Sequence, residues 1–397
     1  MVRYNIEDID ESMVLGESIF LPSGELLLAA GYRVKEKYRD RLKQLGYKNI
    51  CVEVEGTEEV VPSAVVSDAA QREMSSSVEA TSKELANAIQ QFRQKSTLKV
   101  RELIKENKQH LNKFIMSAGM SKALEQFVDE IMNQSSIVLN LSALQQTEPG
   151  LLNHALNVTL SALCIGRKYK YSYDEMKQLG IGALNYDLGL VALPKELLEK
   201  KFSEYNESEL KTYRQHTVFG FLMLSQNHTI PSTSAAVALQ HHEYQNGCGY
   251  PQGLKGDNRP PLKDFSRNNM IHRFAEIVAV ADAYDSFISG RYHEGIERMD
   301  VKGAMKKIIE MGGESLNSDI VKTLTGIIPI FPVGARVKIT SAPTPQLVGY
   351  YGVIARDNPE NLEMPQIILY ETKNHQKVKP ILIDLARYKG FALELTN

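Results

Sequence analysis

The chain has 397 residues, enough for two to four domains that each bury a core of their own. Hydrophobic residues make up 43% and charged residues 24%, as in ordinary globular proteins, and a formal net charge of −2 excludes an overall basic field for nucleic-acid polymers or anionic membranes. The three cysteines form no CxxC pair, which argues against a disulfide framework or a thiolate zinc site. Since no apolar run resembles a membrane span or a secretory signal, the sequence predicts a cytoplasmic protein.

The first part of the chain, residues 1–56, predicts a small α/β module. Two short strands in "SIFLPSGELLLAAG" flank a Pro-Ser-Gly turn, "KEKYRDRLKQLGY" has the pattern of an amphipathic helix ending at Gly46, and "NICVEV" indicates a strand. Residues 57–119 are predicted as a linker followed by one long helix over 71–116. That helix is either a solvated connector or a surface that pairs with a partner helix, which makes a homodimer one hypothesis.

The rest of the chain changes from helical to β patterns. Apolar positions at a period of 3.6 dominate residues 120–328 and predict a helical bundle. Short β-rich runs with turn residues between them predict a small domain over 332–397. The predicted fold class is therefore multidomain α+β, with an N-terminal α/β module, a central all-α domain and a C-terminal β-rich domain.

Histidines and aspartates recur on the apolar faces of the predicted central helices. A lone histidine on such a face is usually a satisfied core residue, but several in one core leave many polar groups to satisfy. A metal bound by side chains from facing helices would satisfy them together. Imidazole and carboxylate ligands suit iron, manganese, zinc or nickel. The candidate ligands are His154, Asp187, His216, His241, His242 and Asp282.

The loop after the histidine pair, residues 241–262, is rich in glycine. Glycines permit positive φ and close backbone approach, and Pro251 stiffens the chain beside Tyr250. A loop joined directly to a ligand pair is well placed to line the rim of a site. Gly249, Tyr250 and Pro251 are therefore predicted to contact substrate, whereas a turn-rich connector would explain the glycines but not their attachment to two histidines.

These motifs resemble the HD-GYP family, bacterial phosphodiesterases that hydrolyse cyclic di-GMP to linear pGpG or GMP. The resemblance covers residues 120–328 and rests on the signature HHExxxGxGYPxGLxG. It also places Asp282 in "ADAYDSF" at a late metal ligand, Arg291 at a phosphate-binding arginine and His154 on an early helix of the core. The signature residues are His241, His242, Glu243, Gly247, Gly249, Tyr250, Pro251, Gly253, Leu254 and Gly256.

The chain departs from the family at its HDxGK motif. The stretch aligned with it is "YDLGL", so Asp187 remains but Tyr186 replaces the histidine and Leu190 replaces the lysine. Gly150 stands where members with three metals carry a glutamate, so a third metal is not expected. Glu294 replaces a basic residue that some members carry after the arginine.

The resemblance implies two-metal hydrolysis, in which two cations stabilise the attacking and leaving oxygens of an in-line displacement. It assigns catalytic roles to Asp187, Tyr250 and Arg291. One metal would use Asp187, His216, His241 and His242, all present. The other would use His154, Asp187, Asp282 and the histidine that is now Tyr186. Because a phenol with a pKa of about 10 is a poor ligand, we expect one firmly bound metal and a second that is weak or absent.

Three hypotheses follow. The leading one is a degraded site that binds cyclic di-GMP or a related nucleotide with little or no hydrolysis. The second is an active phosphodiesterase that tolerates Tyr186, and the third is an interaction scaffold that binds no ligand. The resemblance also makes diguanylate cyclase domains candidate partners.

Overall fold

The computed structural model describes residues 1–397 apart from 21–25, 46, 48, 62–64, 91–94, 114, 135, 140–150, 263–268, 292–293 and 397. The described residues form two compact units. One unit is drawn from 1–65, 138–148 and 327–397, and the other from 66–137 and 149–326.

The N-terminal part of the first unit contains two small antiparallel sheets and a helix. Strand β1 (Val2–Asn5) pairs with β4 (Asn49–Val52), and β2 (Ile19–Phe20) pairs with β3 (Leu26–Leu28). A 3₁₀ helix, η1 (Ile6–Asp8), follows β1, and α1 (Glu36–Gln44) precedes β4. The predicted Pro-Ser-Gly turn and Gly46 lie outside the described residues.

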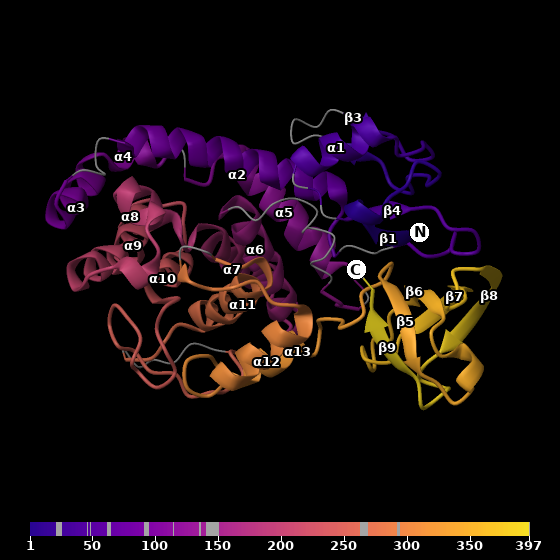
Figure 1. Ribbon diagram of the computed structural model, residues 1–397. Coiled ribbons are helices and arrows are strands. Elements are labelled where there is room, and N and C mark those ends of the chain that lie inside the picture. Colours follow the sequence, from indigo (N-terminus) through magenta and orange to yellow (C-terminus); the bar gives the residue numbers. More distant parts are fainter. Residues whose placement is uncertain are drawn as a thin grey trace. The chain divides into compact units, whose positions relative to one another are not determined.

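The C-terminal part is a single antiparallel sheet in the order β8-β7-β6-β5-β9, drawn in orange and yellow in Figure 1. Burial alternates at the start of β5, where Val337 and Ile339 are buried on either side of the half-buried Lys338, whereas β6 is buried at four consecutive positions. The predicted C-terminal β structure is confirmed. The strands are β5 (Arg336–Ser341), β6 (Tyr351–Arg356), β7 (Gln366–Glu371), β8 (Lys377–Asp384) and β9 (Ala392–Leu395), with the 3₁₀ helix η7 (Pro345–Leu347) after β5.

The first and last segments of the chain share this unit. The backbone N–H of Arg3 donates to the carbonyl oxygen of Gly334 at 2.8 Å, and Val2 and Val60 belong to the hydrophobic core of the C-terminal sheet. The sequence patterns predict separate segments ending at residue 56 and beginning at residue 332. In the structure the N-terminal and C-terminal segments belong to one compact unit.

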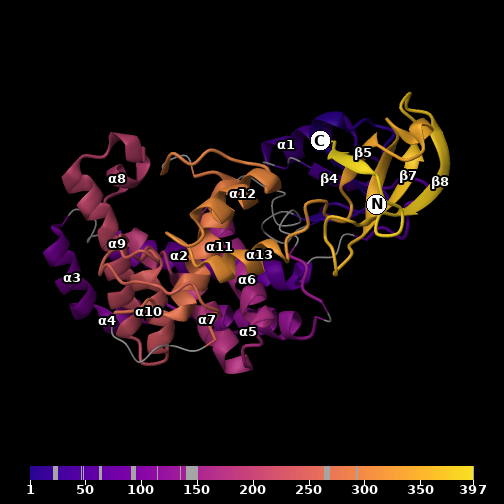
Figure 2. The same cartoon turned by 90° about the horizontal axis from the view of Figure 1, so that it is seen from below.

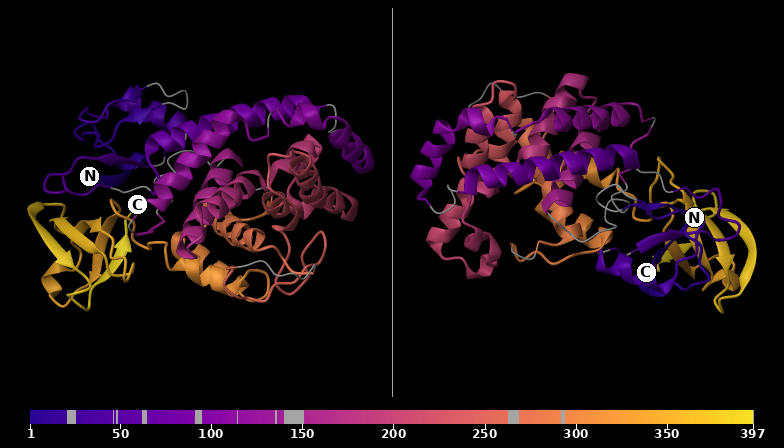
Figure 3. Two further views of the ribbon diagram at one scale, coloured as in Figure 1. Left: turned by 180° about the vertical axis from the view of Figure 1, so that it is seen from behind. Right: turned by 90° about the horizontal axis from the view of Figure 1, so that it is seen from above.

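The helical unit begins with several helices where one long helix was predicted. The expectation over 71–116 is wrong as a single element, because α2 (Asp68–Ile89) is followed by α3 (Thr97–Glu106) and α4 (Lys108–Leu111). The side chain of Ser96 accepts a hydrogen bond from the backbone of Lys99, so it caps a new helix rather than continuing the old one. Helix α2 packs against α5 (Ala118–Met132), as Figure 3 shows.

The predicted mostly helical central domain is confirmed by the rest of this unit. Helix α6 packs against α7 and α11, and α10 packs against α7 and α9 (Figure 2). In the described residues, no helix has the length and apolar character needed to cross a membrane. The helices are α6 (Leu151–Lys168), α7 (Tyr173–Asn185), α8 (Lys195–Glu199), α9 (Glu207–Ser225), α10 (Ser232–Gln240), α11 (Arg273–Ser289), α12 (Val301–Met311) and α13 (Ser318–Thr325), with the 3₁₀ helices η4 (Leu188–Ala192) and η5 (Phe202–Glu204).

Candidate metal centre

Asp187 is held beside helix α9 by a close backbone contact. Helix α7 ends at Asn185, and the chain turns through Asp187 into the 3₁₀ helix η4. A Cβ atom on Gly189 would lie 1.9 Å from the carbonyl oxygen of His216, so only glycine lets η4 approach α9 this closely. The Asp187 carboxylate is thereby placed next to the His216 ring.

The histidines reach the same point from α9 and from the end of α10. His216 is fully buried, and its Nδ1 lies 2.8 Å from the carbonyl oxygen of Tyr213. His241 follows α10, and its Nδ1 lies 3.2 and 3.1 Å from the carbonyl oxygens of Val237 and Ala238. Since a carbonyl oxygen only accepts, each Nδ1 carries a proton and each ring turns its Nε2 atom towards the site.

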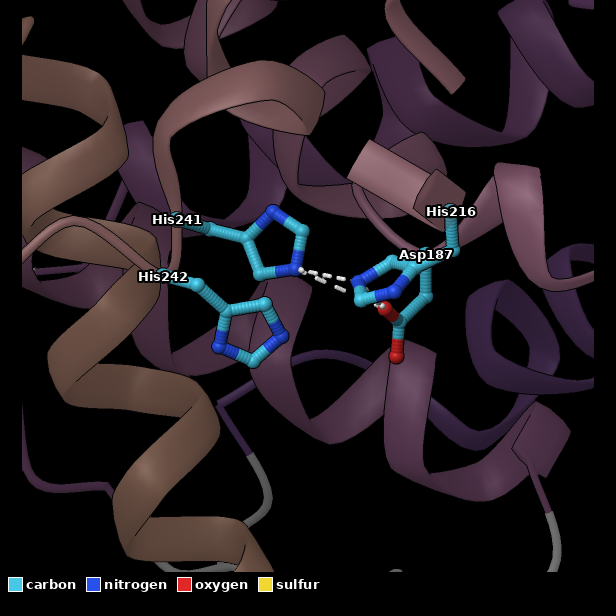
Figure 4. A group of neighbouring side chains, drawn as sticks. All are labelled: Asp187, His216, His241 and His242. Atoms are coloured by element: carbon cyan, nitrogen blue, oxygen red, sulfur yellow. Dashed lines mark hydrogen bonds and ion pairs between the residues drawn. The ribbon is translucent and has the colours of Figure 1, made fainter. Parts of the chain in front are cut away.

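Four ligand atoms converge on one small volume, as Figure 4 shows for Asp187, His216, His241 and His242. The Nε2 atoms of His216 and His241 lie 3.6 and 3.5 Å from Asp187 Oδ1, and 3.4 Å from each other. One ligand atom from each of the four residues lies within 4.8 Å of the others.

The charges of this cluster favour a cation. Burial lowers the pKa of His216 to about 4, and burial together with the neighbouring rings lowers the pKa of His242 well below its usual range. Burial alone would raise the pKa of Asp187, but His241, Arg291 and His216 hold it well below the usual range of a carboxyl group. Near neutral pH an ionised carboxylate therefore faces neutral imidazoles.

The spacing of the cluster fits a divalent transition metal. Ligand atoms about 2.0–2.2 Å from an ion lie about 2.8–3.1 Å apart in octahedral coordination and about 3.3–3.6 Å apart in tetrahedral coordination. The separations of 3.4, 3.5 and 3.6 Å fall within the tetrahedral range. Asp187, His216, His241 and His242 would hold the ion, and the backbone carbonyls behind His216 and His241 would orient their rings.

A second group of polar side chains adjoins the cluster through Tyr186, whose ring meets that of His241, and is organised differently. The Tyr186 hydroxyl lies 2.6 Å from His154 Nε2 and donates to Asp282 Oδ1 at 2.8 Å. His154 Nε2 also lies 2.8 Å from Asp282 Oδ1, and its Nδ1 lies 2.7 Å from Asp285 Oδ2. All four contacts are within hydrogen-bond range, and the 2.6 Å contact between Tyr186 and His154 is shorter than the spacing of two ligands on one ion. In this arrangement the polar atoms of the group are paired with one another and are not open to a second metal.

The protonation states of the second group agree with internal pairing. Burial opposes charge on His154, but its hydrogen bonds to Asp282 and Asp285 raise its pKa to about 9. Burial and the nearby carboxylates of Asp282 and Asp187 raise the pKa of Tyr186 well above the usual range of a phenol. His154 is thus an imidazolium and Tyr186 a neutral donor near neutral pH.

Arg291 is in the site but is paired with carboxylates. Its Nη1 donates to Glu294 Oε1 at 2.6 Å, and its Nη2 donates to Asp187 Oδ2 at 3.3 Å. Nη1 also lies 4.0 Å from Asp282 Oδ1. The predicted phosphate contact of Arg291 stays a prediction, and a phosphate reaching it would meet these carboxylates.

The glycine-rich loop brings Tyr250 to the cluster. The Tyr250 ring stacks on His242 with a centroid distance of 4.7 Å, and the exposed Arg214 lies 4.9 Å above the Tyr250 ring. A Cβ on Gly249 would lie 2.4 Å from the carbonyl oxygen of His242, so the loop can fold back only with glycine there. Pro251, after Tyr250, is exposed.

Glu243 holds the glycine-rich loop in place through hydrogen bonds. Its buried carboxylate accepts hydrogen bonds from the backbone N–H groups of Gln252 and Leu254 at 2.7 and 2.8 Å. This fixes the position of the loop relative to the histidine pair.

Of the predicted ligands, the structure brings four into one cluster and places His154 and Asp282 in the adjoining group. Gly150 lies outside the described residues. Sequence reasoning missed Asp285, which is buried and also accepts a hydrogen bond from Asn157 Nδ2 at 2.8 Å. The available signal was the spacing of three between Asp282 and Asp285, which puts both carboxylates on one helical face.

The middle part of the chain is similar to known proteins. Residues 138–320 match the family described as HD domain. A cyclic di-GMP phosphodiesterase of Pseudomonas aeruginosa is 23% identical over 275 residues, covering 69% of this chain and 61% of the relative. The cyclic di-GMP phosphodiesterase response regulator RpfG of Xanthomonas campestris is 34% identical over 131 residues, covering 32% of this chain and 31% of the relative. The chain thus spans less than two thirds of either relative.

Among solved structures, an HDG"Y"P protein from Bdellovibrio bacteriovorus aligns with a TM-score of 0.43 and 17% identity, covering 82% of this chain and 98% of that one. Residues 138–320 therefore form an HD domain, and its cluster of Asp187, His216, His241 and His242 could hold a metal ion. With these relatives the chain resembles the HD-GYP family, with "YDLGL" in place of HDxGK.

Proposed function

We propose that the central domain binds cyclic di-GMP or a related nucleotide at a one-metal centre and hydrolyses it weakly or not at all. The observation that carries this proposal is the position of the Tyr186 hydroxyl between His154 Nε2 and Asp282 Oδ1. These two residues would be needed for a second metal, and here they are paired with each other and with Tyr186. A site that lacks its second cation keeps a binding surface but loses part of its catalytic power.

The metal held by Asp187, His216, His241 and His242 would supply a Lewis acid for a ligand phosphate. The chain's own residues would do the rest. Tyr250, stacked on His242, presents a ring and a phenol at the rim beside Gly249 and Pro251. Arg291 provides a buried positive charge next to Asp187, positioned to orient a phosphate.

Leu190 adds to the expected loss of hydrolysis. It is buried in the hydrophobic core that includes Leu193 and Phe219, at the place where the family motif has a lysine. Removing one preorganised charge-stabilising group commonly lowers the rate by about 10² to 10³-fold. The missing lysine and the altered second metal position act on the same step, so their effects are not expected to be additive.

An active phosphodiesterase is the second candidate. It is favoured by the four-residue cluster, whose spacing fits a metal, and by relatives named cyclic di-GMP phosphodiesterases. Under this alternative His154, Asp187 and Asp282 would suffice for the second ion. A scaffold that binds no nucleotide is the third candidate, and it predicts no calorimetric signal with cyclic di-GMP at high micromolar concentration.

The deciding experiment combines metal analysis with an assay of pGpG release. We expect about one metal per chain, measurable binding of cyclic di-GMP and little turnover. Two metals per chain with rapid turnover would replace our proposal with the active enzyme.

A motif restoration tests the same point from the other direction. Tyr186→His with Leu190→Lys is expected to add a second metal equivalent and raise hydrolysis by about 10²-fold or more. The single variant Leu190→Met, which keeps the position apolar, serves as the control. Unchanged low turnover in a doubly restored variant that holds two metals would show that the defect lies elsewhere.

The binding partners of the protein and its location in the cell are also proposals. Cyclic di-GMP is the proposed ligand, and a homodimer and a diguanylate cyclase domain are the proposed macromolecular partners. Sedimentation of the full chain, alone and with a cyclase domain, would test both. The family supports placing the protein in the bacterial cytoplasm.

A further inference from the structure

Glu294 holds the guanidinium of Arg291 at the edge of the metal centre. Arg291 Nη1 donates to Glu294 Oε1 at 2.6 Å, and the Tyr213 hydroxyl lies 3.4 Å from the same oxygen. The side chains of Arg291 and Glu294 are only 7% and 14% exposed, so the pair is weakly screened by water. The carboxylate is therefore a fixed part of the site.

The charge of Arg291 is already matched before any ligand binds. Besides Glu294, its guanidinium faces Asp187 at 3.3 Å and Asp282 at 4.0 Å. Asp187 belongs to the metal cluster and Asp282 pairs with His154, whereas Glu294 pairs with Arg291 and is not one of the four cluster residues. Its negative charge thus acts on Arg291, at the place where a ligand phosphate would bind.

We propose that Glu294 is a specificity-determining residue, which occupies Arg291 as a ligand phosphate would and so favours the cyclic dinucleotide over its linear, more highly charged form. This inference rests on the proposed function. Each phosphodiester of the cyclic ligand carries one negative charge, whereas a terminal phosphomonoester carries about 1.5 to 2 near neutral pH. Glu294 repels the terminal phosphomonoester more strongly than a phosphodiester, since like charges placed together in a poorly screened site oppose binding.

The test is isothermal calorimetry on the full chain loaded with manganese. We expect Glu294→Gln to tighten binding of linear pGpG by about tenfold and of cyclic di-GMP by about threefold, because the repulsion that the substitution removes scales with ligand charge. The matched control is Glu297→Gln, which removes the same charge from an exposed side chain nearby and should change neither affinity by more than about twofold. Equal gains for both nucleotides, or equal gains in the control, would overturn the inference.

A probe that does not depend on the nucleotide separates this inference from the proposed function. If the wild-type chain does not bind cyclic di-GMP, the proposed function fails. Inorganic phosphate then still tests Glu294, because Glu294→Gln should bind it at least about fivefold more tightly than wild type. No gain in phosphate affinity would reject the role of Glu294 even if the nucleotide binds.

The gain must also pass through Arg291. In the double variant Arg291→Gln with Glu294→Gln, the extra phosphate affinity should disappear; its persistence would show that Glu294 acts by another route. Melting curves establish that each variant is folded. Should Glu294→Gln not fold, Glu294→Asp keeps the charge but withdraws it from Arg291, and at least a twofold gain in phosphate affinity is then required.

Discussion

Two neighbouring groups of buried polar side chains differ in how their polar atoms are satisfied. In the cluster of Asp187, His216, His241 and His242, the ligand atoms of the first three residues lie 3.4 to 3.6 Å apart, and the proton on each of the His216 and His241 rings faces a backbone carbonyl. In the group of His154, Tyr186, Asp282 and Asp285, donors and acceptors meet at 2.6 to 2.8 Å. The carboxylate of the first group can bind a cation, whereas the polar atoms of the second group are satisfied by hydrogen bonds to one another. Direct pairing of His154 with Asp282 and Asp285 accounts for much of the difference, and the Tyr186 hydroxyl adds a further contact.

The largest expected effect is on metal content. His216→Ala should lower metal affinity by about 10²-fold or more, because loss of even an outer-shell partner commonly costs about 10 to 100-fold. His154→Ala should leave the metal content near that of wild type. Metal analysis after desalting checks both. Equal metal loss in the two variants would abolish the distinction between the groups.

The two groups should also respond to pH with opposite signs in metal-free protein. The pKa of His154 is raised from 6.5 to about 9, so its stabilisation is complete below pH 6.5 and is lost as the pH rises through 9. The difference in unfolding free energy between wild type and His154→Gln should therefore shrink by about 3 kcal/mol over that range. The pKa of His216 is lowered to about 4, so burying its neutral ring costs the folded state an increasing amount of stability as the pH falls from 6.5 towards 4. Denaturant unfolding at several pH values measures both, and a His154 effect that grows with pH would contradict the assignment.

Asp285→Asn should destabilise the helical unit without releasing the metal. Asp285 is fully buried and accepts from His154 and Asn157, so the loss of its charge should cost about 1.5 to 3 kcal/mol. The exposed Glu297→Gln gives the baseline for a surface change. A drop in metal content comparable to that of His216→Ala would mean that the two groups act as one.

Tyr186→Phe is expected to have the smallest effect. The ring stays buried, while the hydrogen bond to Asp282 is lost, at a cost of about 0.5 to 1.5 kcal/mol. His154 and Asp282 remain in direct contact, so they should not gain a metal. Calorimetric melting and metal analysis test this together; a second metal equivalent in this variant would show that the hydroxyl alone keeps the ion out.

Much of the helical unit could be predicted from sequence because its signals are local. The stripe of His216, Phe219 and Met223 predicts a helix with one buried face, and the structure has it in α9. The single helix over 71–116 failed because its apolar spacing continues across Ser96, whose capping side chain starts a new helix. Strand β1 was missed because it is four residues long and pairs with the distant β4.

The same limit applies to the site. Histidines on apolar faces indicate inward-pointing ligands, which is why the cluster residues could be selected. The state of the second group depends on how α6 packs against α11, since that contact brings His154 to Asp282 and Asp285. No local pattern shows whether two such residues face a metal or each other. The pairing of Arg291 with Glu294 was likewise invisible, although the spacing of three was present in the sequence.

Gly189 carries a consequence for protein engineering. Because only glycine lets η4 lie against the carbonyl oxygen of His216, a larger residue at position 189 would displace the backbone that presents Asp187. Tyr186 and Leu190 are buried, so a graft at these positions has to fit the space they fill. With Gly189 retained, wild type and the Tyr186→His, Leu190→Lys variant would form a matched pair for measuring in a single protein what a second cation contributes to phosphodiester chemistry.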